Sequence, residues 1–144
     1  MKLEAIFDMW DQDSGVDRNR LDEEALNISK LHAKYHRIFT NERLTHRKYE
    51  AELKELKLQK FEFYTQGPTK ETVEKGWSLP PIGKVLKADA NTYVDADKDI
   101  INLSLKIGIQ HEKIGLLESI IRTIQNRGYN IRAAIDYIKF TSGG

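Results

Sequence analysis

Apolar residues near the C-terminal end of the chain recur at alternating intervals of three and four. This alternation places them on one stripe of an α-helix, and over three heptads it is typical of a coiled-coil seam. Polar Gln110 occupies one position of the repeat, while Leu105, Ile109, Leu116 and Ile120 widen the apolar stripe. The excess apolar surface must pack on the rest of the chain or on other copies of it. The seam residues, which we predict to form an oligomerisation surface, are Ile100, Leu103, Ile107, Ile114, Leu117, Ile121 and Ile124.

Polar residues and glycine flank this apolar stripe. Asp95, Asp97 and Asp99 precede it, where carboxylates can cap free N–H groups and oppose the helix dipole. An EF-hand loop starting at Asp95 is disfavoured, because its required Gly and Glu positions hold Ile100 and Lys106. Gly128 is a typical helix stop, and a second, shorter helix could follow from Asn130. Residues 95–144 are therefore predicted to form a helical hairpin, with Ile131, Ala134, Ile135 and Ile138 on the second helix.

The segment from Leu21 to Gln66 contains no proline or glycine and favours helix throughout. Its main apolar positions recur every seven residues, and Glu42 interrupts them. The pattern fits one long helix, or two helices joined by a break near residues 40–41. One face should pack, and the rest should be solvated. The repeating positions are Leu21, Ile28, Tyr35, Tyr49, Leu56 and Phe63.

Turn-forming residues separate the two helical regions. Gly67-Pro68 ends the first region, and the segment between the two also contains Gly76, Pro80, Pro81 and Gly83. We predict a long loop over residues 67–94, with a possible short strand or hairpin around residues 84–86 and 92–94. A short amphipathic turn is expected over residues 1–10. The fold class is mainly α, as a single domain with a helical segment at 1–66, a loop at 67–94 and a hairpin at 95–144.

Composition narrows the possible functions. The 144-residue chain has no cysteine and no apolar run long enough to cross a membrane, so it reads as soluble and intracellular. It lacks a phosphate-binding glycine loop, a nucleophile elbow and a zinc-binding HExxH motif. His32 and His36 could hold a metal weakly, but a solvated basic face explains them more simply. We therefore predict no enzymatic activity, no cofactor and no metal site.

The distribution of charge is more informative than its total. Residues 1–29 carry three basic and eight acidic side chains, whereas residues 30–60 carry nine basic and four acidic, a net of +5. Aromatic residues follow the basic block directly. Cations that track phosphates beside rings that stack on bases are the ingredients of single-strand binding, although a solvated helix face is the simpler alternative. The predicted DNA-binding residues are Arg43, Arg47, Lys48, Lys54, Lys57, Lys60, Phe63 and Tyr64.

Several of these features resemble the UvsY family of tailed-phage recombination mediators. Ala96-Asp97-Lys98-Asp99 before an apolar helix, and Arg127-Gly128-Tyr129 after it, match the C-terminal half of that family. Phe63-Tyr64-Thr65 before a glycine resembles its basic, aromatic-ended segment. The resemblance maps a basic DNA contact of the family onto Lys60. The family's other basic position is Leu58 here, and neighbouring Lys57 is the candidate substitute.

The resemblance implies an accessory protein that binds single-stranded DNA as a ring-like homo-oligomer. It also implies contacts with a RecA-like phage recombinase (UvsX) and with the phage single-strand-binding protein, in the cytoplasm of an infected bacterial host. Two alternatives stay open from the residues alone. One is a structural coiled-coil or adaptor oligomer that touches no nucleic acid, and the other is a helical loader for a replication protein.

Overall fold

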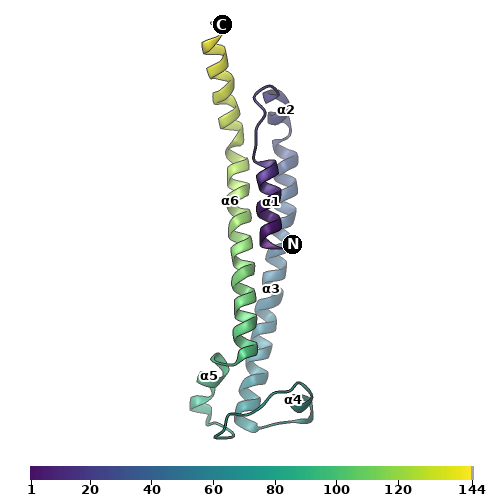
Figure 1. The fold of residues 1–144 in the computed structure, drawn as a ribbon, viewed down its shortest axis with the longest axis vertical. Helices are drawn as coiled ribbons and strands as arrows, with labels where there is room; N and C mark the ends of the chain where they lie inside the picture. Colours follow the sequence, from purple (N-terminus) through teal and green to yellow (C-terminus); the bar gives the residue numbers. More distant parts are fainter. Residues whose placement is uncertain (144) are drawn as a thin grey trace. The chain divides into compact units, whose positions relative to one another are not determined.

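Residues 1–143, which the computed structural model describes, form six helices and no strands (Figure 1). The two longest, α3 and α6, contain 39 and 44 residues. The helices are α1 (Leu3–Asp13), α2 (Leu21–Leu26), α3 (Ile28–Gln66), α4 (Lys70–Glu74), α5 (Lys87–Asp95) and α6 (Lys98–Thr141). The mainly α fold predicted from the sequence is confirmed.

The chain divides into two compact units, and each long helix contributes to both. The first unit contains Met1–Leu44 and the part of α6 from Ile109 onward, and the second contains Thr45–Gly108. The sequence-based expectation of a single domain stays a prediction.

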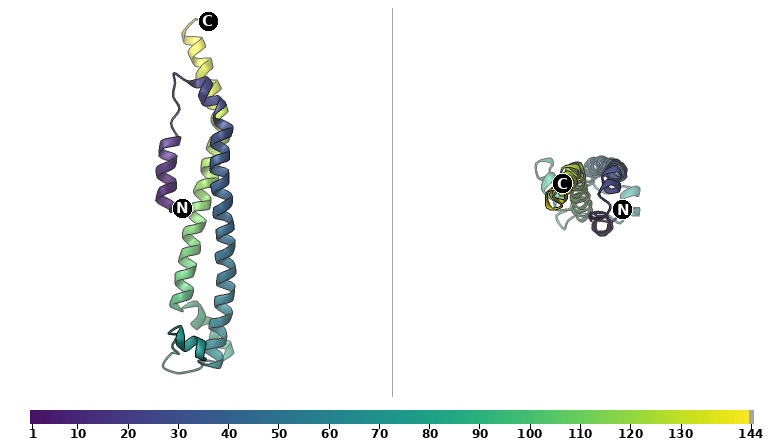
Figure 2. Two further views of the ribbon diagram at one scale, coloured as in Figure 1. Left: turned by 90° about the vertical axis from the view of Figure 1, so that its right-hand side faces the viewer. Right: turned by 90° about the horizontal axis from the view of Figure 1, so that it is seen from above.

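The core of the first unit forms where α1 packs on α3 and α6 (Figures 1 and 2). Ile6 of α1, Tyr35 of α3, and Leu117 and Ile124 of α6 are fully buried. The Trp10 ring packs edge-on against Tyr35, with 5.5 Å between the ring centroids. The expected amphipathic turn at the N-terminus is thus a helix that completes this core.

The core of the second unit gathers the end of α3, the connecting segment, α5 and the start of α6. Phe63, Tyr64, Val85, Val94 and Ile100 are buried together there. α3 ends as expected at Gly67, whose φ of 94° is a left-handed conformation that glycine adopts without strain. The Val85 N–H then donates to the Tyr64 carbonyl at 2.9 Å, tying the segment back to the helix.

Two polar residues of the heptad series meet inside the first unit. Glu42 of α3 and Gln110 of α6 are 7% and 2% exposed. The Gln110 amide donates to the Glu42 carboxylate and, at 2.7 Å, to its backbone carbonyl. Lys113 adds a cation 3.9 Å from the same carboxylate. The two polar residues that interrupt the apolar series of α3 and α6 therefore form one buried polar contact between these helices.

The helical hairpin predicted for residues 95–144 is wrong. α6 continues through Gly128 and Asn130 to Thr141, and Gly128 has no positive φ. Tertiary contacts of the residues on both sides of Gly128 favour a continuous helix there. Arg127 donates to the carbonyls of Asp13 and Ser14, at 3.0 and 2.9 Å, and Ile131 is 3% exposed.

The loop predicted for residues 67–94 is corrected in part, because it contains α4 and most of α5. Residues 84–86 form no strand, and residues 92–94 are helical. The helix break lies at Asn27, between α2 and α3, and not near residues 40–41.

The aspartates before α6 have separate roles. Asp97 is its N-cap, and its carboxylate accepts from the N–H groups of Asp99 and Ile100 at 2.9 and 3.4 Å. Asp99 lies in the first turn, where its charge opposes the helix dipole. Asp95 is the last residue of α5, so the cap predicted for it is wrong.

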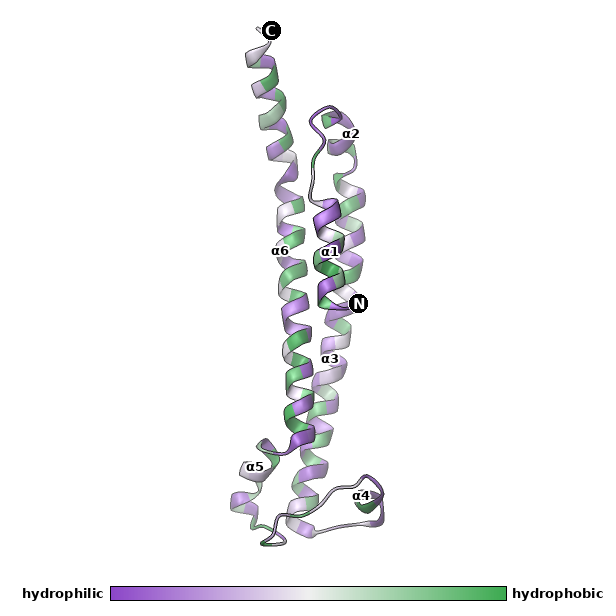
Figure 3. Cartoon of the chain, viewed as in Figure 1, coloured by the Kyte–Doolittle hydropathy of each residue, from purple (hydrophilic) through white to green (hydrophobic). Residues whose placement is uncertain are grey.

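The apolar seam of α6 is largely occupied within the chain. Ile100, Leu117, Ile121 and Ile124 are buried, whereas Leu103, Ile107 and Ile114 are intermediate. Figure 3 shows hydrophobic positions along the whole of α6, including its last turns. Apolar side chains that remain exposed on this helix include Leu105, Ile109, Tyr129, Tyr137 and Phe140. The oligomerisation surface predicted on the seam stays a prediction, and these exposed residues are further candidates for it.

Candidate nucleic-acid interface

Three of the predicted DNA-binding cations lie on one stripe of the part of α3 that belongs to the second unit. Arg47, Lys54 and Lys57 follow the spacing of seven and three that keeps side chains on one side of a helix. All three are exposed, as is Arg43, which belongs to the first unit. Glu50 shares the stripe, and its carboxylate lies 3.0 Å from His46 Nδ1. We call these three cations the cationic stripe.

A second stripe of α3 is acidic. Glu52, Glu55 and Glu62 are exposed on it together with Gln59 and Gln66. Lys48 begins this stripe, so the structure separates it from the other predicted cations. The two stripes flank an uncharged ridge that includes Ala51, Leu58 and Thr65. Of the glutamates that offset the basic block in the sequence, Glu52 and Glu55 thus face away from the cationic stripe, while Glu50 lies on it. The stripe keeps a net positive charge, which favours an anionic partner along it.

Lys60, in contrast, is buried, and the structure corrects its expected exposure. It is 2% exposed, and its Nζ lies 3.1 Å from Asp97 and 2.8 Å from Asp99. The same nitrogen is 3.8 Å from the centre of the Trp77 ring, a cation–π distance. The ammonium is therefore neutralised within the second unit, and a DNA contact by Lys60 stays a prediction that requires these ion pairs to open.

The two predicted stacking rings are also buried. Phe63 and Tyr64 are 3% and 8% exposed, in the core of the second unit. The Tyr64 hydroxyl donates to Asp97 at 2.7 Å. Burial raises the pKa of Tyr64 above its usual value, and the hydrogen bond and charge of Asp97 raise it further. The rings are core residues in this conformation, so they are not available to stack on a base.

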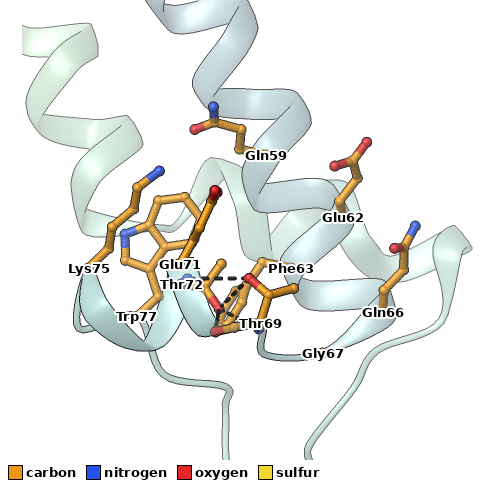
Figure 4. Close-up of a pocket in the computed structure, with 10 residues that line it drawn as sticks. All are labelled: Gln59, Glu62, Phe63, Gln66, Gly67, Thr69, Glu71, Thr72, Lys75 and Trp77. Atoms are coloured by element: carbon orange, nitrogen blue, oxygen red, sulfur yellow. Dashed lines mark hydrogen bonds between the residues drawn. The ribbon is translucent and has the colours of Figure 1, made fainter.

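Trp77 is an accessible aromatic residue next to these two buried rings. It is half-buried and lines a pocket of about 190 Å³. Figure 4 shows Trp77, Lys75 and Glu71 on one side of this pocket and Glu62 and Gln66 of α3 on the other. We call it the Trp77 pocket. The sequence does not predict this pocket, because a single Trp in an expected loop gives no sign of the residues that lie opposite it.

Other sites receive no support from the structure. The His32 and His36 rings stack at 5.7 Å between centroids. Among residues 1–143, no group of three or more acidic, histidine or cysteine side chains could hold a metal ion. No helix in this part of the chain is both long and apolar enough to span a bilayer.

The family profile described as "Recombination, repair and ssDNA binding protein UvsY" matches residues 9–144. The chain belongs to the UvsY family. The resemblance read from the Ala-Asp-Lys-Asp and Arg-Gly-Tyr segments is thereby confirmed. No individual curated protein sequence matches the chain significantly.

Solved structures of a UvsY protein share this fold. Three crystal forms of the bacteriophage T4 recombination mediator protein UvsY superpose with TM-scores of 0.79, 0.81 and 0.78. They are 20%, 18% and 21% identical to this chain, in the same order. The alignments cover 98%, 95% and 99% of this chain and 99%, 98% and 98% of the T4 chain. At this identity the match establishes the fold, and the family profile carries the link to recombination and single-stranded DNA.

Proposed function

We propose that this protein is a recombination mediator without enzymatic activity, acting in the cytoplasm of an infected bacterial host. It binds single-stranded DNA as a homo-oligomer and helps a RecA-like phage recombinase replace the single-strand-binding protein. The separation of the cationic stripe from the acidic stripe on α3 is the observation that carries the DNA-binding part. Membership in a family described by recombination, repair and single-stranded DNA binding supports the proposed role in recombination.

Several copies of the stripe in one assembly would compensate for weak binding by each. Linked sites can raise avidity by about 10²–10⁴-fold without any new contact. A strand that spans several subunits would follow a path set by the assembly. We propose that this path bends or extends the strand, which loosens the single-strand-binding protein. Energy transfer between dyes on the two DNA ends should then change on binding, and an unchanged signal would contradict this step.

The mediator activity is tested by recombinase ATP hydrolysis on single-stranded DNA coated beforehand with the single-strand-binding protein. Adding the protein should shorten the lag before steady hydrolysis, because the recombinase gains access to the strand. A variant with Arg47→Ala, Lys54→Ala and Lys57→Ala should lose this effect. If the wild type binds DNA but leaves the lag unchanged, a helical loader for another replication protein becomes the better account.

A further inference from the structure

We propose that the Trp77 pocket is a nucleobase site, in which one unstacked base of a bound single strand packs on the Trp77 ring. The proposal rests on the proposed single-strand binding and deepens it. It assigns the base-stacking role to a residue of the connecting segment between α4 and α5, in place of the buried Phe63 and Tyr64.

The Trp77 ring is held in place before any ligand arrives. It packs edge-on against Phe63, with 5.6 Å between centroids and an interplanar angle of 73°. Trp77 and Phe63 also line a neighbouring pocket that contains Lys60, Asp97 and Asp99. Because Lys60 lines only that neighbouring pocket, its ammonium approaches the ring from there. The half-buried indole is thus a fixed platform for stacking on the side of the Trp77 pocket.

The polar walls of the pocket suit the edge of a base. Gln59 and Gln66 offer both donors and acceptors, whereas Glu62 and Glu71 offer carboxylate acceptors. A carboxylate can accept from the exocyclic amino group of cytosine, adenine or guanine, which thymine lacks. The pocket should therefore favour cytosine over thymine.

The charges around the pocket favour a base and oppose a phosphate inside it. Glu62 and Glu71 would repel an entering phosphate, so the backbone should stay outside. The cationic stripe lies across the uncharged ridge of Ala51, Leu58 and Thr65, and Leu58 is 59% exposed. A strand held by Lys54 and Lys57 could direct a base over this apolar ridge. Lys75 lines the pocket, and its Nζ lies over the Trp77 ring, 5.0 Å from the ring centre. This exposed side chain would move aside when a base stacks there, and its ammonium could then meet the adjoining phosphate.

The test uses the variant Trp10→Phe, in which Trp77 is the only tryptophan. Labelled dC and dT homopolymers of equal length are titrated with the protein, and DNA anisotropy and Trp77 emission are recorded together. Both strands should bind, Trp77 emission should change in step with the anisotropy, and dC should bind several-fold more tightly than dT. Trp77→Ala should weaken dC binding about fivefold or more, provided that its helical content is unchanged.

Exposed acidic residues provide variants that should not disturb folding. Glu62→Gln should reduce the preference for dC, because an amide carbonyl is a weaker acceptor than a carboxylate and Glu71 still offers one carboxylate. Glu55→Gln is the matched control, since it makes the same change of charge two turns earlier on the same stripe, outside the pocket. It should leave the ratio of dC to dT affinity unchanged.

The outcomes separate this proposal from the proposed function. DNA binding without a change in Trp77 emission, or with Glu62→Gln and Glu55→Gln behaving alike, would overturn the base site and leave single-strand binding intact. Absence of binding to either strand would overturn the proposed function itself. Quenching of Trp77 by an arginine-containing peptide, but by no oligonucleotide, would assign the pocket to a protein partner.

Discussion

Two sets of one lysine, one aspartate and one tyrosine fasten other segments to α3. In the first unit, Asp13 of α1 accepts from Lys34 and Tyr35 at 2.6 and 2.8 Å. In the second unit, Asp97 before α6 accepts from the Tyr64 hydroxyl at 2.7 Å and lies 3.1 Å from Lys60. Each carboxylate thus joins a distant segment to a buried tyrosine. Hydrogen bonds of this kind to a charged group contribute roughly 1.5–3 kcal/mol each.

These carboxylates make stability depend on pH. Burial alone raises the pKa of Asp97, but hydrogen bonds from Tyr64 and Lys60 and the Lys60 charge outweigh burial and lower the pKa overall. The contribution of Asp97 is therefore present above the usual aspartate pKa of about 3.9 and is lost as the pH falls through its lower folded value. The wild-type free energy of unfolding should decline from about pH 5 downward.

Asp97→Asn should be less stable than the wild type at neutral pH and should show a shallower decline in acid. Because asparagine can also cap a helix, the loss of stability reports the removal of the Asp97 charge. Urea denaturation at a series of pH values measures both effects. Asp95→Asn, on an exposed residue at the end of α5, is the control and should follow the wild type. An acid decline in Asp97→Asn as steep as that of the wild type would contradict this role.

For single residues, the sequence predicted the chemical role of a side chain better than it predicted whether that side chain is buried or exposed. The cap by Asp97 followed from its place before an apolar helix. The burial of Lys60 could not be predicted, because its partners Asp97, Asp99 and Trp77 are 17 to 39 positions away. Lysine is rarely buried unless it is paired, and a sequence pattern does not reveal a pair made across the fold.

At the scale of elements, α6 shows how packing overrides a local stop signal. Glycine within a helix is less favourable than alanine by about 1 kcal/mol, yet α6 passes through Gly128. The buried residues Arg127 and Ile131 hold the turns on either side. The prediction of a hairpin relied on local sequence, whereas the tertiary contacts of Arg127 with residues near the N-terminus decided the outcome.

Gly128→Ala should stabilise the protein by roughly 0.5–1 kcal/mol, because alanine favours the helix. An added Cβ would meet only Ile28 Cδ1, at an ordinary contact distance of 3.9 Å. Thermal or urea unfolding measures the change, and Gly67→Ala, where φ is 94°, should instead destabilise. Destabilisation by Gly128→Ala would support the hairpin that the sequence first predicted.

The contact between Glu42 and Gln110 should specify how α3 and α6 align within the first unit. Gln110→Leu should cost about 1–3 kcal/mol, because it leaves a buried carboxylate without its amide partner. Adding Glu42→Leu should recover most of that loss, since a packed apolar pair can replace a buried polar one. Urea denaturation of both single variants and the double variant tests the coupling, and additive effects would contradict it.

The sequence predicted both interruptions of the heptad series without predicting that they would meet. Heptad spacing fixes which face of each helix packs, but the alignment of two helices requires tertiary information. The connecting segment was harder to predict, because α4 and α5 have only five and nine residues and lack a long apolar period. The apolar period therefore predicted the packed faces of the two long helices, but it did not predict how far α6 continues, and it missed the short helices α4 and α5.

For the whole molecule, exposed aromatic side chains at the end of α6 are candidates for a subunit contact in the expected homo-oligomer, in addition to the half-buried part of the seam. Tyr129, Tyr137 and Phe140 are 74%, 61% and 85% exposed and lie on one side of the last turns of α6. Aromatic groups exposed together commonly mark a protein contact. Tyr137→Ser with Phe140→Ser should lower the mass measured by light scattering and leave helical content unchanged. Leu26→Ser, at a site 82% exposed on α2, is the control and should not change the mass.

The cationic stripe of α3 is the proposed binding surface for single-stranded DNA. Its most direct test is the anisotropy of a labelled oligonucleotide, titrated over a range of salt with wild type and with Arg47→Ala/Lys54→Ala/Lys57→Ala. Lys48→Ala/Lys70→Ala/Lys87→Ala removes the same charge from exposed lysines outside the stripe and serves as the control. Light scattering first confirms equal assembly size.

Wild-type binding should weaken steeply with salt. The stripe variant should bind more weakly. The slope of log affinity against log salt should also fall in magnitude by about 2 per subunit bound, because each of the three lost phosphate contacts contributes roughly 0.7. The control should retain nearly the wild-type slope and affinity. Equal losses in both variants would mean that only total charge matters, and tight binding by the stripe variant would place the DNA elsewhere on the protein.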